Sequence, residues 1–272
     1  MIEIIFLLSL ALIWIIFATI QDIKKREVAN WLNFSLIIFA LGFRFFFCLF
    51  SENFSFFYQG IIGLLIFFVM GNIFYYSKLF AGGDAKLLIA LGAILPLSTN
   101  FIINLYYFFY FIFIFLIIGG IYGFIFSIVL AIKNKKQFKK QFKIEFKQNK
   151  KIIYLSIFSA ILFSLFGFYF SLFFYLSILI LALPYLFIYS KSVEKSSMIK
   201  EISTKKLTEG DWLYKDIKIK NKTIKATWEG LSKKEIKLIK NNLKKVKIKQ
   251  GIPFVPVFLI SFLIFIYFFF RI

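Results

Sequence analysis

The chain has 272 residues, of which 61% are hydrophobic and 22% aromatic, whereas only about half of a soluble domain is apolar. This composition predicts a polytopic membrane protein. The sequence contains no His and a single cysteine, Cys48, which excludes Ser–His and Cys–His nucleophiles, His-ligated zinc and an intramolecular disulfide.

The formal net charge is +21, from 34 Lys and Arg against 13 Asp and Glu. The basic residues gather in blocks between long apolar segments, as in cytoplasmic loops beside an anionic membrane surface. We therefore expect membrane lipids as partners and no nucleic acid.

Apolar segments long enough, or nearly long enough, to cross a bilayer follow one another along the whole chain. They predict an all-α polytopic membrane protein with about eight transmembrane helices. The first segment lacks the basic start of a cleaved signal peptide and is followed by a basic block, so we expect it to be a spanning helix. The segments are 2–20, 32–50, 58–77, 85–98, 101–132, 152–169, 171–190 and 253–270.

Placing the basic block Lys24-Lys25-Arg26 in the cytoplasm predicts the side of every later loop by alternation. The loops at 78–86, 133–151 and 191–251 then face the cytoplasm, and all of them contain Lys. The loops at 50–57 and 97–100 face outward and contain none. We expect a multi-pass protein of the cell membrane with both termini outside.

These segments predict five regions. They are a membrane domain (1–132), a basic cytoplasmic loop (133–151), a transmembrane helical hairpin (152–190), a basic cytoplasmic domain (191–252) and a C-terminal transmembrane helix (253–272). Within 191–252, alternating apolar and polar residues at 217–227 predict strands. Ser232 and Glu235 match a capping box that opens a helix toward Lys245, so we expect a small α+β domain.

Two aspartates stand apart from the other acidic residues. Asp22 follows the first apolar segment and Asp84 precedes the fourth, so alternation puts both at the cytoplasmic interface, where buried acids tend to be functional. Two facing carboxylates retain one proton between them, and the pair can then activate a water and protonate a leaving amide. Two simpler interpretations stay open: Asp22 as a solvated residue, and Asp84 as a helix cap.

Gly82 and Gly83 precede Asp84 directly. Without Cβ atoms they let the backbone leave helical geometry and let an extended peptide approach closely. Lys86, two residues after Asp84, is placed to orient the pair or its substrate.

Other functions fit parts of this pattern. A cation or proton-coupled transporter would also use Asp22 and Asp84, but it predicts inverted repeats and acids at mid-membrane. A non-catalytic scaffold would use the basic domain to bind anionic lipid. The transporter is not supported, because no repeat is visible and both acids lie at one interface. The scaffold predicts that loss of Asp84 leaves activity intact.

The two aspartate blocks carry a family resemblance. Residues 22–32, DIKKREVANWL, resemble the aspartate block of type IV prepilin peptidases. Residues 82–86, GGDAK, resemble their glycine-aspartate motif, although the family has a glycine where this chain has Ala81. Residues 209–213 and 251–256 look like the C-terminal region of archaeal prepilin and preflagellin peptidases.

The resemblance implies a membrane aspartic endopeptidase that removes the short basic leader from archaeal pilin-like or archaellin precursors at the cytoplasmic face. It assigns catalysis to Asp22 and Asp84, without metal or cofactor. The cysteine-bearing domain of the bacterial members, associated with their N-methyltransferase activity, is absent, so we expect no methyl transfer. The residues expected to shape the site or bind substrate are Gly82, Gly83, Lys86, Lys24 and Asn30.

Overall fold

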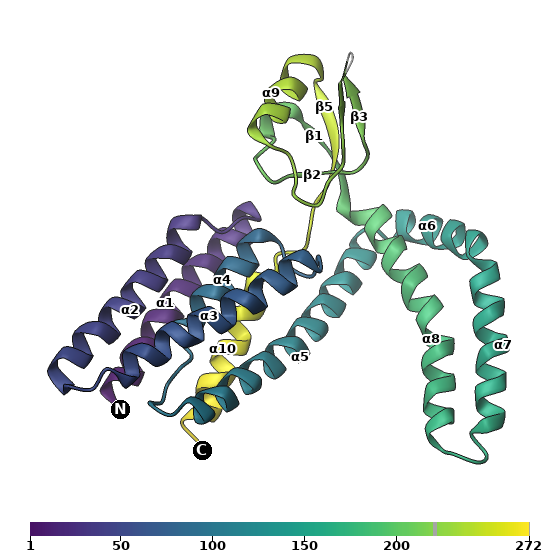
Figure 1. The fold of residues 1–272 in the computed structure, drawn as a ribbon. Helices are drawn as coiled ribbons and strands as arrows, with labels where there is room; N and C mark the ends of the chain where they lie inside the picture. The colour runs from purple at the N-terminus through teal and green to yellow at the C-terminus, as the bar shows by residue number, and fades with distance from the viewer. Residues whose placement is uncertain (220–221, 272) are drawn as a thin grey trace. The chain divides into compact units, whose positions relative to one another are not determined.

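The computed structural model describes residues 1–219 and 222–271. The chain divides into two compact units, which we describe separately. Unit 1 contains residues 1–123 and 252–272, and unit 2 contains residues 124–251. Figure 1 shows the elements of both.

Unit 1 is a helical bundle. Its short helix α4 packs against α2 and α3, while α1 packs against α2 and α10. The apolar side chains of α4 are almost fully buried, so this helix forms the centre of the bundle although it has only 11 residues. The helices are α1 (Ile2–Lys25), α2 (Asn30–Ser51), α3 (Ser55–Tyr76), α4 (Gly82–Gly92), the first part of α5 (Phe101–Lys133), and α10 (Val255–Phe269).

Glycines let α3 and α4 approach closely. A Cβ on Gly63 would lie 2.4 Å from the carbonyl oxygen of Gly92, and a Cβ on Gly92 would lie 2.7 Å from that of Gly63. Such contacts between small residues are a common way to pack helices in membranes, where the hydrophobic effect does not drive helices together.

The C-terminal end of α4 is held by a buried arginine. Arg44, on α2, has no exposed surface. Its guanidinium donates hydrogen bonds to the carbonyls of Ala93 at 3.0 Å and Ile94 at 3.2 Å, and also to that of Pro96. A fourth bond, of 2.9 Å, goes to the carbonyl of Phe56. Arg44 therefore satisfies carbonyl groups that the end of a helix leaves free.

Unit 2 begins with the last part of α5 and contains a helical part and a small sheet. α7 (Lys150–Phe166) and α8 (Leu172–Val193) form a hairpin, and α6 (Lys135–Gln148) packs against α8. Glu145 of α6 is fully buried and forms ion pairs with Lys191 at 3.2 Å and Lys195 at 2.5 Å. These bonds join α6 to the end of α8 and to the π-helical turn η1 (Glu194–Met198).

The rest of unit 2 is an α+β region. Its antiparallel sheet has the strand order β1-β5-β2, and β3 pairs with β4 as a hairpin. Aliphatic side chains such as Ile239 and Val246 form its core. The elements are β1 (Ile199–Ser203), the 3-10 turn η2 (Thr204–Lys206), β2 (Trp212–Leu213), β3 (Ile217–Ile219), β4 (Lys222–Ile224), α9 (Lys233–Asn242) and β5 (Lys245–Lys249).

The predicted fold class is confirmed: the chain is largely helical, with long apolar helices and a small α+β region before the last helix. Each of the eight predicted segments is helical over most of its length. Within the described residues five helices are long and apolar enough to span a membrane, or six if α6 and α7, bent by 67°, count as one span. Because α4 and α10 are shorter, the number of eight crossings stays a prediction.

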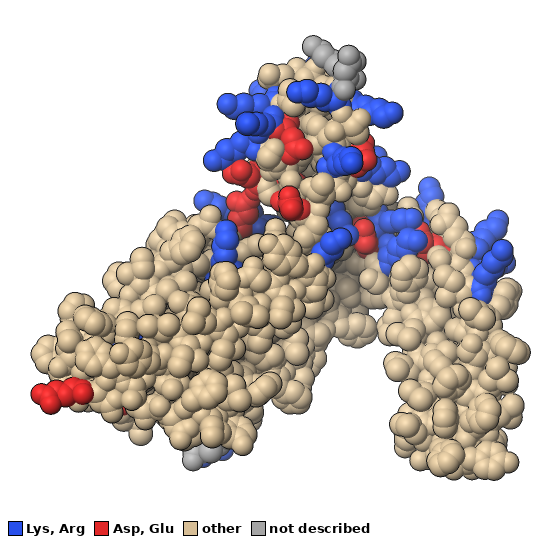
Figure 2. All heavy atoms as spheres, in the orientation of Figure 1, with Lys and Arg blue, Asp and Glu red and all other residues tan. Residues whose placement is uncertain are grey.

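Two local predictions can be compared directly with the structure. The capping box is confirmed, since the Ser232 N–H donates to the Glu235 carboxylate at 2.9 Å and the Ser232 hydroxyl accepts the Glu235 N–H at 3.4 Å. The basic segment 133–151 is not an irregular loop: most of it is the amphipathic helix α6, which packs Phe138 and Phe146 against tyrosines of α8. Figure 2 shows the Lys and Arg side chains gathered over α6 and the α+β region.

Candidate active site

Asp22 lies in the last turns of α1, where its side chain is buried. Its Oδ2 accepts a hydrogen bond of 2.9 Å from the N–H of Val255, the first residue of α10. A helix N-terminus carries free N–H groups and a partial positive charge, so it stabilises a carboxylate. The prediction placed Asp22 just beyond the helix. The helix in fact continues to Lys25, and the solvated interpretation of Asp22 is wrong.

Asp84 is the third residue of α4 and is also buried. Its Oδ2 accepts a hydrogen bond of 3.3 Å from the N–H of Ala81, the residue that precedes the helix. Asp84 thus forms part of the cap of its own helix, as one of the simpler interpretations expected. This role accounts for only one of its acceptor sites, because an ionised carboxylate can accept about four hydrogen bonds.

The two aspartates come together. The charge of Asp22 acts directly on the Asp84 carboxyl group, so the pair is close enough to interact as like charges. An aromatic cluster explains the approach: the ring of Phe80, just before α4, lies 5.8 Å from that of Phe254, just before α10. Phe115 of α5 packs against both rings. The cluster therefore fixes the start of α4 beside the start of α10, which holds Asp22.

The glycines before Asp84 do not have the backbone geometry predicted for them. Gly82 and Gly83 are the first residues of a regular helix, so the expectation that they leave helical geometry is wrong. A Cβ on Gly82 would meet its nearest atom, in Tyr75, at 3.8 Å, and one on Gly83 would meet Val28 at 3.5 Å. Packing therefore does not require glycine here.

Lys86 and Asn30, both expected to shape the site, do meet. The Lys86 ammonium donates a hydrogen bond of 2.7 Å to Oδ1 of Asn30, at the start of α2. The bond joins α4 to α2. Lys24 lies apart from this contact, exposed in the last turn of α1.

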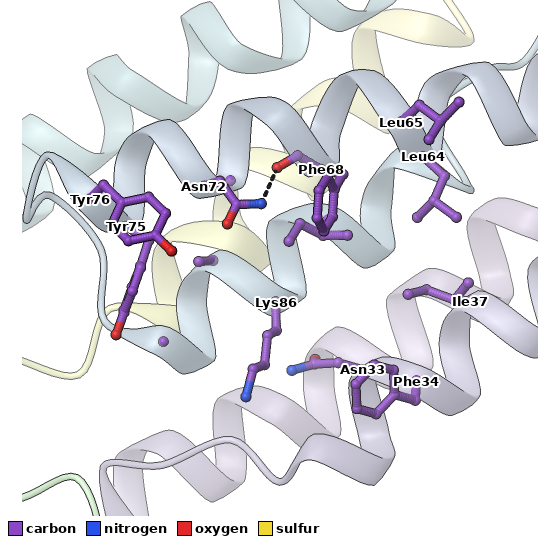
Figure 3. Close-up of a pocket in the computed structure, with 14 residues that line it drawn as sticks. Asn33, Phe34, Ile37, Leu64, Leu65, Phe68, Asn72, Tyr75, Tyr76 and Lys86 are labelled. Carbon is purple, nitrogen blue, oxygen red and sulfur yellow. Dashed lines mark hydrogen bonds between the residues drawn. The ribbon is translucent and has the colours of Figure 1, made fainter. Parts of the chain in front are cut away.

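A groove opens next to these residues, between α2, α3 and α4 (Figure 3). Its volume is about 660 Å³, and most of its wall is apolar. Gly82, Ala85 and Lys86 of α4 line it, whereas neither aspartate does. Asn33 of α2 also lines it and lies beside Lys86 in Figure 3.

Two buried, interacting carboxylates form a site suited to acid–base chemistry. Among the described residues no group of three or more Asp, Glu or Cys side chains gathers in a way that would hold a metal ion.

Both aspartates lie within a segment that matches a known family. Residues 9–128 match the model of the type IV leader peptidase family. The resemblance inferred from the two aspartate blocks is thereby confirmed for this part of the chain.

The curated relatives that match are preflagellin peptidases. That of Methanocaldococcus jannaschii is 32% identical over 84 residues, which are 31% of this chain and 36% of the relative. That of Methanococcus maripaludis is 32% identical over 82 residues, 30% and 35% of the two chains. That of Methanococcus voltae is 28% identical over 88 residues, 32% and 37%. The chain thus spans little more than a third of the length of these relatives. No solved structure matches it.

Sequence reasoning missed two neighbours of Asp22 and one residue that lines the groove. The N–H of Val255 comes from a residue 233 positions away from Asp22, and only the proline-bearing block 251–256 marked that region. Tyr122 of α5 also interacts with the charge of Asp22. Asn33 lies within an apolar segment, where a polar residue indicates a functional position.

Asp211, in unit 2, takes part in a turn. It accepts the N–H of Thr208 at 2.8 Å and follows Gly210, whose φ is +92°, so it stabilises a turn.

Proposed function

We propose that this chain is a membrane aspartic endopeptidase that removes the basic leader from pilin-like or archaellin precursors. The observation that carries the proposal is the interaction of the buried Asp22 and Asp84 within the segment that matches the leader peptidase family. The names of the relatives favour an archaellin-type precursor as the substrate.

In the proposed reaction the two carboxyl groups hold one proton between them. The ionised group takes a proton from a water, whose oxygen then bonds to the carbonyl carbon of the scissile peptide. The protonated group gives its proton to the leaving nitrogen as the C–N bond breaks. One water is consumed, and the products are a carboxylate and an amine.

We further propose that the aspartates face the cytoplasm. The support is the charge pattern: alternation from the block Lys24-Lys25-Arg26 puts every Lys-rich loop on one side and the Lys-free loops on the other. The leader of such precursors is also presented on that side, according to the family resemblance. The chain as a whole is basic and does not itself attract a basic leader. The attraction would come from the carboxylates at the site.

The test incubates membranes that contain the protein with a precursor and follows loss of the leader by gel shift. Asp22→Asn and Asp84→Asn should each lower the rate at least about 100-fold, because an amide neither accepts nor donates the required proton. Asp211→Asn is the matched control and should cleave at the parent rate. Near-parent cleavage by either site variant, with normal insertion, would refute the mechanism.

A further inference from the structure

The groove between α2, α3 and α4 changes from polar to apolar along its length (Figure 3). Asn72, Tyr75 and Lys86 lie toward one end, and Leu64 and Leu65 lie toward the other. The part of α3 from Leu64 to Tyr75 is about 16 Å long, at about 1.5 Å per residue. The groove therefore has the polarity of a molecule with a polar head and a long apolar chain.

Two polar groups at the first end have bonding capacity that the fold leaves unused. Asn33 is 1% exposed, and within the part of the chain that the structure describes neither atom of its side-chain amide has a hydrogen-bond partner. Native proteins rarely keep such a costly group without a reason. The Lys86 ammonium has three N–H groups and donates one to Asn30, but it forms no ion pair with an acidic residue described in the structure.

These groups follow one another in depth along α2. Asn30, Asn33 and Ile37 are spaced by three and four positions, so they lie on one face of the helix. The Lys86 ammonium is held at Asn30, the unpaired amide comes one turn later, and the apolar wall begins at Ile37. A ligand whose charged group contacts Lys86 thus reaches Asn33 with its next polar atoms and Ile37 with its chain.

The apolar side of the groove is open. Phe34, Phe68 and Leu65 line it and are 57%, 54% and 59% exposed, on helices long enough to span a membrane. A lipid can therefore enter from the side. The volume of about 660 Å³ lies within the range of roughly 300–1,000 Å³ that is typical of sites for single small molecules, so the groove fits one amphipathic molecule.

The charge of Lys86 selects the headgroup. An ammonium binds a phosphate as a point charge, and anionic lipids attract such cations at the membrane surface. A choline headgroup would instead bring a second cation close to Lys86. The ester and hydroxyl oxygens of a glycerol lipid can accept from, and donate to, the amide of Asn33.

We propose that this groove is a binding site for one anionic phospholipid. The phosphate lies on Lys86, the glycerol region lies beside Asn33, and an acyl chain runs along Ile37 and Leu64. Because neither aspartate lines the groove, the lipid is separate from the aspartate pair, and this inference does not depend on the proposed peptidase function.

A first experiment counts bound lipid by native mass spectrometry of the full chain in detergent. The probes are phosphatidylglycerol and phosphatidylcholine with the same acyl chains. The parent should bind one phosphatidylglycerol at least about fivefold more tightly than phosphatidylcholine, and Lys86→Gln should weaken phosphatidylglycerol binding about tenfold. The control Lys24→Gln removes an exposed charge that does not line the groove and should bind like the parent. Equal binding by the two variants, or equal affinity of the parent for both lipids, would overturn the proposal.

A second experiment follows the melting temperature. Phosphatidylglycerol should raise that of the parent by about 3 °C and that of Asn33→Leu by less than half as much. Without lipid, Asn33→Leu should melt no lower than the parent, because it loses an amide that has no partner. The control Asn104→Leu loses hydrogen bonds to Gln59 and Ser98, so it should melt lower but keep the full lipid shift. Equal lipid shifts in the parent and Asn33→Leu would contradict the proposal.

A third experiment locates the chain. Phosphatidylglycerol with a photoreactive group at the end of one acyl chain is added at one equivalent, and the labelled peptides are mapped. Label should appear at Leu65 of α3 well above that at Phe17 of α1, which is similarly exposed, and Lys86→Gln should remove this preference. Equal labelling of the two positions in the parent would show that lipid only coats the helices, and the proposed site would be wrong.

Discussion

Asp22 and Asp84 differ in what holds them. Asp22 accepts an N–H from the start of another helix, α10, whereas Asp84 accepts one only from the residue before its own helix. The position of Asp22 thus depends on long-range packing. That of Asp84 follows from local sequence, which explains why sequence reasoning described the second better than the first.

Ala81 replaces a glycine of the family motif without visible strain. It adopts φ −72° and ψ 162°, a conformation open to any residue, and its N–H reaches the Asp84 carboxylate. The departure from the motif is therefore compatible with the position of the acid.

Arg44 is the buried residue whose loss should matter most to folding. Arg44→Met would leave four carbonyl groups without their donor, so we expect a loss of about 3 kcal/mol of stability, measured as resistance to unfolding in detergent. The exposed Arg271→Met is the control and should change stability by at most about 0.5 kcal/mol. Similar stability of the two variants would contradict this role.

Glu145 supplies a pH-dependent contact in unit 2. Burial raises its pKa, but hydrogen bonds from Lys195 and Lys191 outweigh burial, and the net pKa lies below the ordinary value of 4.5. Since the pKa is lower in the folded state, the contribution to stability is fully present above pH 4.5 and is lost as the pH falls through the folded-state pKa.

Glu145→Gln should therefore lower the melting temperature at pH 7 by about 3 °C, and the difference from the parent should shrink under acid conditions. The exposed Glu201→Gln is the control and should change little at either pH. A difference that stays constant from pH 7 to acid would show that the ion pairs do not contribute.

At the scale of elements, apolar length predicted the long helices well, because a run of about 20 apolar residues has few alternatives in a membrane. It predicted α4 less well, since this helix ends at Gly92 and the carbonyls that follow it bond to Arg44. No local signal connects Arg44 with residues about 50 positions later. The strands β1 and β5 were missed for the same reason, because they pair across more than 40 residues.

The contact between α3 and α4 gives a direct test at this scale. Gly63→Ala would push a Cβ into the Gly92 carbonyl, so we expect a loss of about 1–3 kcal/mol and slower cleavage as α4 shifts. Gly120→Ala is the matched control, because a Cβ there meets nothing within 4 Å. Equal effects of the two substitutions would show that α3 and α4 can separate without cost.

For the whole molecule, the predicted crossings can be tested by labelling. The natural cysteine, Cys48, is fully buried, so it should react little with a thiol reagent. A cysteine at Asn53 should react with a membrane-impermeant thiol reagent in intact cells, whereas one at Lys136 should react only after the membrane is opened. Both positions are exposed, so burial does not decide the result. Labelling at position 136 in intact cells would reverse the proposed orientation.

The central claim is that Asp22 and Asp84 act as one catalytic pair. The most direct measurement compares kcat/KM for precursor cleavage by Asp22→Asn, Asp84→Asn and the double variant. Residues that act as a unit are strongly non-additive, so the double variant should be no slower than the slower single variant. If the two losses instead multiply in the double variant, the aspartates act independently and the claim is wrong.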